Sequence, residues 1–279
     1  MKNKIRLLII GKNSFIASYI FFNLKNKIFI KRITYSKFIK KSEAFLSKFD
    51  YLLNCSLKKE YVFKNYSKRF DLDYYILNKI KKININYIFL SSRKIYKPKL
   101  NIRETDKILP QDNYAKNKLI TENYIKKNIR NNYLILRVSN IIGSRLVNNN
   151  KSHNLFLDNF MLNLKNRVVF AHNNSFKDFI SINQFTSIFF KIINKNLKGT
   201  FNVSLGKKIY LSEILQWLTS FCKKSLIVKN YDINNKVYNS DSFTLDNSKL
   251  KKALNIYIKK KDLKKYCENL SKKIFLKIN

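Results

Sequence analysis

Apolar residues near the N-terminus follow first the pattern of a strand and then that of a helix. Residues 5–10 are mostly apolar and lead directly into Gly11, as a buried strand ending at a turn does. From Phe15 to Leu24, apolar residues recur at the spacing of one helical face. The pattern therefore predicts a strand, a tight turn and a helix.

The same alternation of short apolar runs and amphipathic stretches continues through the first half of the chain. It predicts further strands at 28–34, 50–54, 87–90 and 133–137, and helices at 70–83 and from about Tyr114 onward. Strands that alternate with helices form right-handed βαβ units around a parallel sheet. We therefore expect an α/β fold.

The character of the chain changes around residue 144. A polar loop follows, and the later segments are shorter and less regular. The clearest elements there are a strand at 199–203 and a helix from about Ser212, capped by that serine and Glu213. We expect a first domain over residues 1–145 and a smaller region over residues 146–279, from which some segments return to the sheet.

The composition indicates a globular chain without a membrane span. Of the 279 residues, 45% are hydrophobic and 14% aromatic, which is too many for a disordered chain, and no apolar run approaches the ~20 residues that cross a bilayer. The first residues lack the longer apolar region and the cleavage site of a signal peptide. The three cysteines are odd in number and lack metal-type spacing, so we expect no disulfide and no metal site. These features favour a cytoplasmic protein.

The formal charge of +40 raises the question of a nucleic-acid partner, because basic surfaces attract phosphate. The excess is nearly all lysine and accompanies abundant Asn, Ile, Phe and Tyr, as expected where A/T-rich codons are favoured. The basic residues are spread through every segment, and lysine lacks the planar fork with which arginine reads base edges. A solvated basic surface is the simpler interpretation, and nucleic acid is not the expected partner.

Glycine is rare in this chain, and all four glycines lie near predicted strand ends: Gly11, Gly143, Gly199 and Gly206. In the run from Gly11 to Ala17, Ser14 and Ala17 occupy the second and third glycine positions of a dinucleotide-binding turn. Both are small enough to let the backbone approach a pyrophosphate at a helix N-terminus. An ordinary strand-to-helix turn is the alternative interpretation.

A Tyr-x-x-x-Lys spacing is uninformative by itself in this sequence. With 17 Tyr and 57 Lys+Arg, about three matches arise by chance, and three occur: Tyr75/Lys79, Tyr114/Lys118 and Tyr257/Lys261. The setting distinguishes Tyr114, which follows the strand ending at Ser91-Ser92 and opens a helical stretch. We interpret Ser92, Tyr114 and Lys118 as a group for hydride chemistry, with Ser91 as the alternative serine.

Several motifs in order resemble the NAD(P)-dependent epimerase/dehydratase family, the extended short-chain dehydrogenases/reductases that act on nucleotide sugars. The resemblance covers almost the whole chain and implies a Rossmann-type doubly wound parallel sheet with a smaller C-terminal α/β substrate-binding region. The matching segments are Gly11-Lys-Asn-Ser-Phe-Ile-Ala-Ser, Phe89-Leu-Ser-Ser92 with Ile95-Tyr96, Glu104 with Pro110 and Tyr114-Ala-Lys-Asn-Lys118, Leu136-Arg137-Val-Ser-Asn140-Ile-Ile-Gly143, Phe176-Lys177-Asp178-Phe179-Ile180, Gly199-Thr-Phe-Asn202-Val203 and Leu245-Asp-Asn-Ser-Lys-Leu250.

The resemblance implies a role for each matching position. Tyr114 would transfer the proton at the sugar carbon, and because a phenol is a poor base at neutral pH, Lys118 would stabilise the phenolate and hold the nicotinamide ribose. Ser92 would hydrogen-bond the reacting oxygen, Asn140 would meet the nucleotide phosphate, and Lys177 would stand where an arginine usually clamps the diphosphate. The cofactor contacts expected are Gly11, Ser14, Phe15, Ile16, Ser36, Lys37, Asn54, Cys55, Ser56, Tyr114 and Lys118.

Two departures from the family pattern indicate which cofactor is preferred and which reaction is not expected. The second strand ends without the acidic residue that would hold the adenosine 2′-hydroxyl, and the nearby Ser36 and Lys37 suit a 2′-phosphate, so NADP is preferred over NAD. Arg93 and Lys94 follow Ser92 where the dehydratases carry an Asp-Glu pair, so water elimination is not expected.

The leading hypothesis is a nucleotide-sugar 4-keto reductase or 4-epimerase, and a homodimer is expected by analogy. A catalytically idle relative and a nucleic-acid-associated protein that keeps the fold are the alternatives. His153 and His172 match no motif and are expected to be ordinary surface or loop residues.

Overall fold

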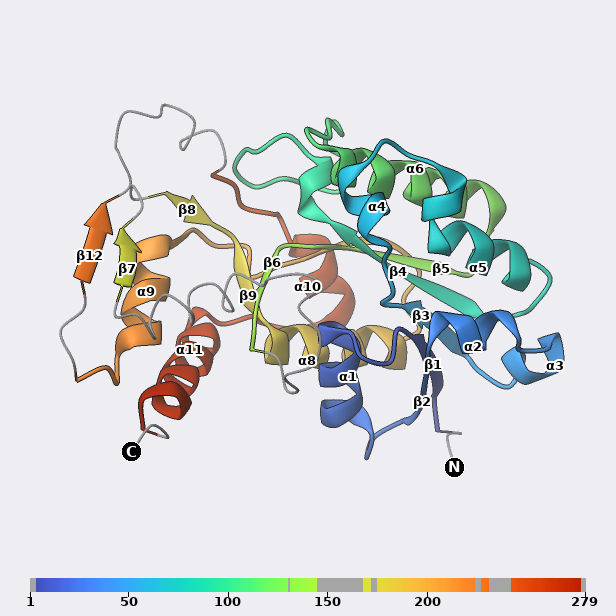
Figure 1. Cartoon of the computed structure of the whole chain (residues 1–279), viewed down its shortest axis with the longest axis horizontal. Helices are drawn as coiled ribbons and strands as arrows, with labels where there is room; N and C mark the ends of the chain where they lie inside the picture. The colour runs from blue at the N-terminus through green and yellow to red at the C-terminus, as the bar shows by residue number, and fades with distance from the viewer. Residues whose placement is uncertain are drawn as a thin grey trace.

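A parallel sheet organises the N-terminal part of the described chain (Figure 1). The structure is a computed structural model and describes residues 4–129, 131–144, 168–171, 175–223, 227–230 and 242–276. Within these ranges the sheet has six strands: β1 (Arg6–Ile10), β2 (Phe29–Ile33), β3 (Tyr51–Asn54), β4 (Asn86–Ser92), β5 (Tyr133–Val138) and β10 (Gly199–Val203).

The strand order is β10-β5-β4-β3-β1-β2, and every neighbouring pair is parallel. Successive connections lead away from β1 in opposite directions, because β2 lies on one side of it and β3 on the other. Such a reversal leaves a crevice at the carboxyl ends of the two diverging strands, where doubly wound folds bind their ligands. In this chain that edge is formed by Gly11 and the segment after Asn54.

Helices cover both faces of the sheet, above and below it in Figure 1. Residues of α1 (Phe15–Leu24), α8 (Ile182–Asn194) and α10 (Ser248–Leu254) share one buried cluster with β1, β5 and β10. On the opposite face, α2 (Tyr35–Ile39), α3 (Glu43–Leu46), α5 (Leu72–Ile80) and α6 (Asn113–Asn128) contribute to a second cluster. Short helices α4 (Lys59–Phe63), η1 (Lys68–Phe70) and η2 (Arg93–Ile95) complete this side.

A smaller set of elements lies beside the sheet. In the part of the chain that the structure describes, three two-stranded sheets pair β6 (Asn140–Ile142) with β9 (Phe179–Ser181), β8 (Phe176–Lys177) with β11 (Ile209–Tyr210), and β7 (Val168–Ala171) with β12 (Ile227–Asn230). Helices α9 (Leu211–Thr219) and α11 (Lys260–Phe275) pack against each other around a buried apolar cluster that contains Trp217 and Cys267.

The expected α/β class and doubly wound parallel sheet are confirmed. Strand β4 ends at Ser92, where the sequence places the strand end. One detail differs: the helix expected to be capped by Ser212 begins at Leu211, where Glu213 accepts a hydrogen bond from the Tyr210 backbone. Among the described helices, none is long and apolar enough to cross a membrane.

Candidate functional site

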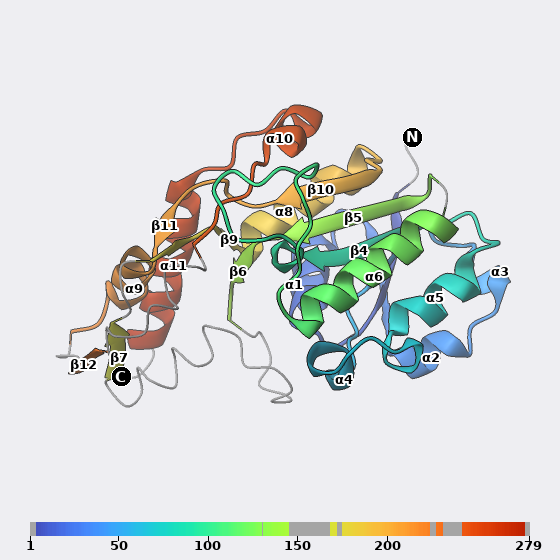
Figure 2. The ribbon, with the colours of Figure 1, turned by 90° about the horizontal axis from the view of Figure 1, so that it is seen from above.

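Helix α6 carries Tyr114 and Lys118 on one face near its N-terminus. Asp112 caps the helix by accepting a hydrogen bond from the backbone N–H of Ala115 at 2.7 Å. Tyr114 lies in the first turn, and Lys118 follows one turn later, which places both side chains on the same side. The helix crosses β4 and β5 (Figure 2), so its first turns reach the carboxyl end of the sheet.

Lys118 is a buried cation surrounded by aromatic rings. Its side chain is only 6% exposed, and its Nζ atom lies 4.4 Å from the ring centroid of Phe89, 5.6 Å from that of Tyr61 and 5.7 Å from that of Tyr114. Ring faces attract an ammonium, more strongly where water is excluded. The cation is thereby held beside the Tyr114 ring, where it can stabilise negative charge on a phenolate.

Ser92 ends β4 and begins η2. Its Oγ accepts a hydrogen bond from the Lys94 backbone at 3.2 Å, which leaves the hydroxyl proton available for another acceptor. Side chains alternate along a strand, so the neighbouring Ser91 lies on the face of Phe89, beneath α6, and Ser92 on the opposite face. The Ser91 hydroxyl is buried and has no hydrogen-bond partner among the described residues.

Gly11 directly follows β1 and contacts the ends of the neighbouring strands β2 and β3. Its φ of +98° lies in the region that favours glycine, and a Cβ atom there would lie 2.8 Å from the Cys55 carbonyl carbon and from the nitrogen and Oγ of Ser56. The backbone N–H of Gly11 donates to the Ile33 carbonyl at 2.9 Å, and that of Cys55 to the Ile10 carbonyl at 2.8 Å. The two turns expected to hold a cofactor are therefore in direct contact.

Ser14 and Cys55 connect these turns to α1 and to Lys118. Ser14 caps α1 by accepting from the backbone N–H of Ala17 at 3.1 Å. Burial raises the pKa of the Cys55 thiol to about 12, and a hydrogen bond with Ser14 and the positive charge of Lys118 act in the opposite direction. Cys55, one of the expected cofactor residues, thus lies within electrostatic reach of Lys118.

Ser36 and Lys37 lie in the first turn of α2, directly after β2. The Oγ atoms of Thr34 and Ser36 are 3.0 Å apart, and Thr34 accepts from the Lys37 backbone at 3.3 Å. Arg32, which is not among the residues predicted from the sequence, donates from Nη1 to the Lys12 carbonyl at 3.2 Å. Its position one residue before the strand end was the available sequence signal, since a basic residue there can reach the glycine turn.

Phe15 and Ile16 begin α1. A Cβ atom at Gly143 would lie 2.5 Å from the Cζ of Phe15 and 2.8 Å from the Cγ2 of Ile182. Phe15 therefore packs into the space left by Gly143, and its ring tethers the first turn of α1 to the segment after β6. Any contact of Phe15 and Ile16 with a cofactor would come from their backbone N–H groups at the helix N-terminus.

Asn140 and Lys177, the expected substrate contacts, meet around Asp178. The backbone N–H of Asn140 donates to the Asp178 carbonyl at 3.3 Å, and Lys177 precedes Asp178 in the chain. The Asp178 carboxylate is fully buried and accepts from the backbone N–H groups of Leu205, Gly206 and Leu245. Burial raises its pKa to about 7 despite these bonds.

Arg137 and Glu122 link α6 to the sheet. Arg137 Nη2 lies 2.7 Å from a Glu122 carboxylate oxygen, and Arg137 Nε donates to the other at 3.1 Å. Both side chains are nearly inaccessible to solvent. Arg137 also donates to the Tyr96 hydroxyl at 2.6 Å. In the sequence, Arg137 stands in one of the matching motifs, but nothing along the chain indicates its partner Glu122.

The residues present fit a dinucleotide cofactor. The Gly11 turn lies at the topological switch point, contacts the Asn54–Ser56 turn and precedes the N-terminus of α1, where backbone N–H groups favour a pyrophosphate. The buried Lys118 ammonium lies within electrostatic reach of the same turn. His153 and His172 fall outside the described residues.

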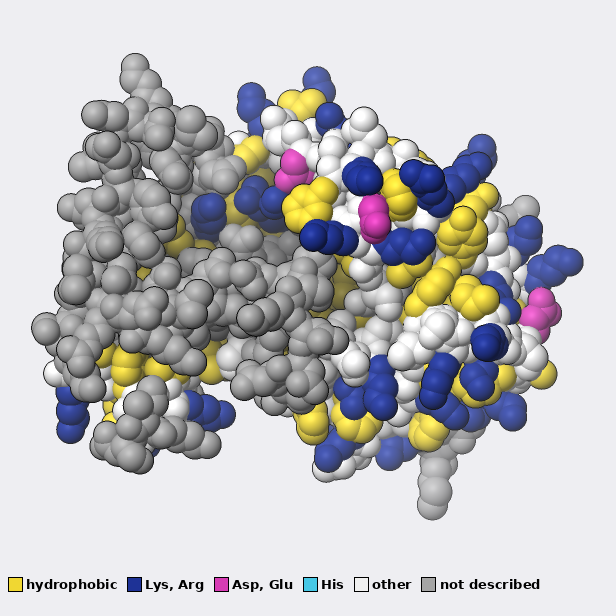
Figure 3. Space-filling model, viewed as in Figure 1, with side chains coloured by type: hydrophobic (Ala, Val, Ile, Leu, Met, Phe, Trp, Pro, Cys, Tyr) yellow, Lys and Arg dark blue, Asp and Glu magenta, His cyan; other side chains and the backbone are white. Residues whose placement is uncertain are grey.

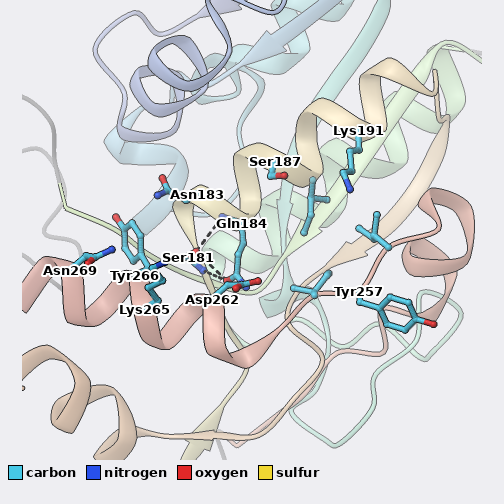
Figure 4. Close-up of a pocket in the computed structure, with 13 residues that line it drawn as sticks. Ser181, Asn183, Gln184, Ser187, Lys191, Tyr257, Asp262, Lys265, Tyr266 and Asn269 are labelled. Carbon is cyan, nitrogen blue, oxygen red and sulfur yellow. Dashed lines mark hydrogen bonds between the residues drawn. The ribbon is translucent and has the colours of Figure 1, made fainter.

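A separate groove of about 350 Å³ lies between α8 and α11 (Figure 4). Lys191 and Ser187 come from α8, whereas Lys265, Tyr266 and Asp262 come from α11. None of the residues expected for cofactor or substrate lines it. The groove is therefore distinct from the site built around Gly11, Tyr114 and Lys118.

Known families and structures agree with this architecture. Residues 39–204 match the model of the NAD dependent epimerase/dehydratase family, whereas no curated protein sequence matches the chain. The structure is similar to a UDP-N-acetylglucosamine 4-epimerase from Methanobrevibacter ruminantium, with a TM-score of 0.80, 19% identity and complete coverage of both chains.

Two further solved structures share the fold. A dTDP-4-dehydrorhamnose reductase from Clostridium acetobutylicum has a TM-score of 0.73 at 17% identity, over 95% of this chain and 99% of that one. A UDP-glucuronic acid 4-epimerase from Bacillus cereus, solved with NAD, has a TM-score of 0.73 at 15% identity, over 97% of this chain and all of that one. The family resemblance inferred from the motifs is confirmed.

Proposed function

This chain belongs to the NAD dependent epimerase/dehydratase family, and on that premise we propose that it is a nucleotide-sugar oxidoreductase, either a 4-keto sugar reductase or a 4-epimerase. Residues 1–145 would chiefly hold the cofactor and residues 146–279 chiefly the substrate. We place its action in the cytoplasm. The observation that carries the proposal is the buried Lys118 ammonium, which lies beside the Tyr114 ring and within electrostatic reach of Cys55.

Each residue of the proposed mechanism has a limited task. When bound, NAD(P) supplies or accepts hydride at the sugar carbon. Tyr114 gives or takes the proton at the sugar oxygen, which requires a stabilised phenolate in one half of the cycle. Lys118 provides that stabilisation through its fixed positive charge. Ser92 at the end of β4, or the alternative Ser91 on the α6 face of that strand, donates its hydroxyl proton to the reacting oxygen.

The substrate would be held by Asn140 and Lys177. The backbone of Asn140 is hydrogen-bonded to the buried Asp178, and Lys177 directly precedes Asp178 in the chain. An amide and an ammonium from these neighbouring strands would suit the phosphates of a nucleoside diphosphate, although lysine offers no bidentate geometry.

The residues around β2 support NADP as the cofactor and therefore favour a reductase over an epimerase. A 2′-phosphate needs cations and hydroxyls in place of the acidic residue that holds a 2′-hydroxyl. Ser36 and Lys37 begin the helix after β2, and Arg32 contacts the Gly11 turn through Lys12. Arg93 and Lys94 follow Ser92 where dehydration would call for acidic residues, which argues against a dehydratase.

The proposal is tested on the purified protein in two steps. Mass spectrometry of the released small molecules and fluorescence titration with NADPH and NADH should reveal a bound or bindable cofactor. A screen of nucleotide 4-keto sugars with NADPH should then detect oxidation of the cofactor at 340 nm if the protein is a reductase, and chromatography of nucleotide sugars incubated with the protein should detect the C4 epimer if it is an epimerase. Failure to bind either dinucleotide would contradict the proposal, whereas binding without turnover of any sugar would favour a catalytically idle partner subunit.

The high positive charge does not favour a nucleic-acid role over this one. In Figure 3, Lys and Arg side chains are scattered among apolar and other groups across the described part of that face, whereas a nucleic-acid site gathers them along one groove. We expect only weak binding to unrelated DNA, lost by 200 mM salt. Tight binding that persists at that salt concentration would favour the alternative.

A further inference from the structure

Asp73 is a buried carboxylate beneath the cofactor turns. It lies in the first turn of α5 and is 3% exposed. One oxygen, Oδ1, accepts hydrogen bonds from the Asn54 side-chain amide at 2.7 Å and from the Tyr87 hydroxyl. No part of the mechanism above uses this carboxylate.

The Asn54 side chain connects Asp73 to the turn that follows β3, because it hydrogen-bonds to both. Its amide nitrogen is occupied by Asp73, so its Oδ1 faces the other way and accepts from the Ser56 backbone N–H at 2.9 Å. Ser56 in turn lies so close to Gly11 that a single added methyl group would meet its nitrogen and Oγ at 2.8 Å. One chain of contacts therefore runs from α5 to the glycine turn.

The surroundings of Asp73 disfavour its charged carboxylate, so packing alone does not explain why an aspartate stands there. Burial, together with the neighbouring charge of Asp71, raises its pKa to about 6, whereas Lys118, Tyr87 and Asn54 act in the opposite direction. A buried carboxylate beside another carboxylate is unfavourable unless its bonds are needed. An apolar residue would fill the same space without this cost.

From this geometry we infer that Asp73 is a positioning residue for the dinucleotide: through Asn54 it holds the 54–56 turn against Gly11 and so sets the affinity for the cofactor. The inference rests on the proposed function, since it concerns the same cofactor site. It assigns no contact between Asp73 and the cofactor itself. The carboxylate acts through the orientation of one amide.

The first test compares cofactor affinity among variants that break different bonds. Asp73→Ala should weaken NADPH binding by about 10-fold in a fluorescence titration, and Asn54→Ala should do the same from the strand side, which also serves if Asp73→Ala does not fold. Tyr87→Phe removes the other donor to the same oxygen and should change affinity by less than about twofold. Wild-type affinity in both alanine variants would overturn the inference.

Two combinations separate positioning from a general loss of structure. The double variant Asp73→Ala/Asn54→Ala should bind NADPH as weakly as either single variant, because the two substitutions remove the same hydrogen bond between Asn54 and Asp73. Asp73→Asn keeps an acceptor oxygen for Asn54 and should recover affinity to within about threefold. Full additivity in the double variant, or no recovery with Asp73→Asn, would overturn the inference.

A third measurement needs no cofactor. The amide hydrogen of Ser56 should exchange with solvent at least about 10-fold faster in Asp73→Ala, whereas that of Cys55, bonded to the Ile10 carbonyl, should change little. Equal exchange of the Ser56 amide in both proteins would overturn the inference. If the wild-type protein binds no dinucleotide, the proposed function fails, and this exchange measurement still decides whether Asp73 holds the turn.

Discussion

Arg137 and Glu122 form an ion pair that is almost wholly buried, with 2.7 Å between Arg137 Nη2 and a Glu122 carboxylate oxygen. The pair joins β5 to α6, the helix that carries Tyr114 and Lys118. Because Arg137 also donates to the Tyr96 hydroxyl, α6 cannot shift relative to β5 without breaking these buried contacts. The position of the proposed acid–base pair is therefore tied to the packing of the sheet.

Glu122→Gln should lower the free energy of unfolding by about 3 kcal/mol, because it leaves a buried guanidinium without its counter-charge. Urea denaturation measures the change. The matched control is Glu268→Gln, which breaks the solvent-exposed pair with Lys264 and should cost less than about 1 kcal/mol. Equal effects of the two substitutions would contradict the assigned role of the buried pair.

Tyr114→Phe should reduce kcat by at least about 100-fold, because it removes the group that transfers the proton. Cofactor affinity should stay within about threefold of wild type, since the ring beside Lys118 is retained. Tyr257→Phe is the control: it has the same spacing to a lysine but is 88% exposed, and it should leave kcat unchanged. Full activity in Tyr114→Phe would refute the assignment.

Gly11→Ala should weaken NADPH binding by at least about 10-fold and lower the Tm. The added Cβ would meet backbone atoms of Cys55 and Ser56 at 2.8 Å, so one of the two turns has to move. Gly199→Ala is the control, because its φ of +95° is similar but no atom lies within 4 Å of the added Cβ. It should cost about 1 kcal/mol of backbone strain without affecting cofactor binding.

The stability of the protein should depend on pH through Asp178. Its pKa is raised from 3.8 to about 7, chiefly by burial, so between these values the folded protein holds a proton that the unfolded chain has lost. Stability contributed by this proton is present at low pH and is lost as pH rises towards 7, by up to about 1.4 kcal/mol per pH unit.

Asp178→Asn cannot titrate, so it reveals this contribution by difference. From pH 5 to pH 7, the free energy of unfolding of wild type should fall relative to that of Asp178→Asn, as followed by urea denaturation at each pH. A difference that stays constant, or one that grows in favour of the wild type, would show that the folded carboxyl group is not held protonated.

Much of the sheet could be predicted because its signals are local. The apolar runs gave five of the strands to within a few residues, and the strand at 199–203 agrees with β10. Helix α8 was missed although a signal was present, since Ser181 and Gln184 form a capping box at its start. Helix α11 was also missed, because its many lysines obscured the apolar face that carries Leu263, Cys267 and Leu270.

By itself, the sequence determined the strand-turn-helix at Gly11, the parallel α/β class and the same-face placement of Tyr114 and Lys118, because each follows from periodicity or short-range sterics. Only the tertiary structure decided which buried groups meet. Asn54 and Asp73 are separated by 19 residues, and Asp178 and Leu245 by 67. Such contacts depend on the order of strands in the sheet and on which charged and polar side chains are buried next to one another. Neither can be read from the spacing of residues along the chain.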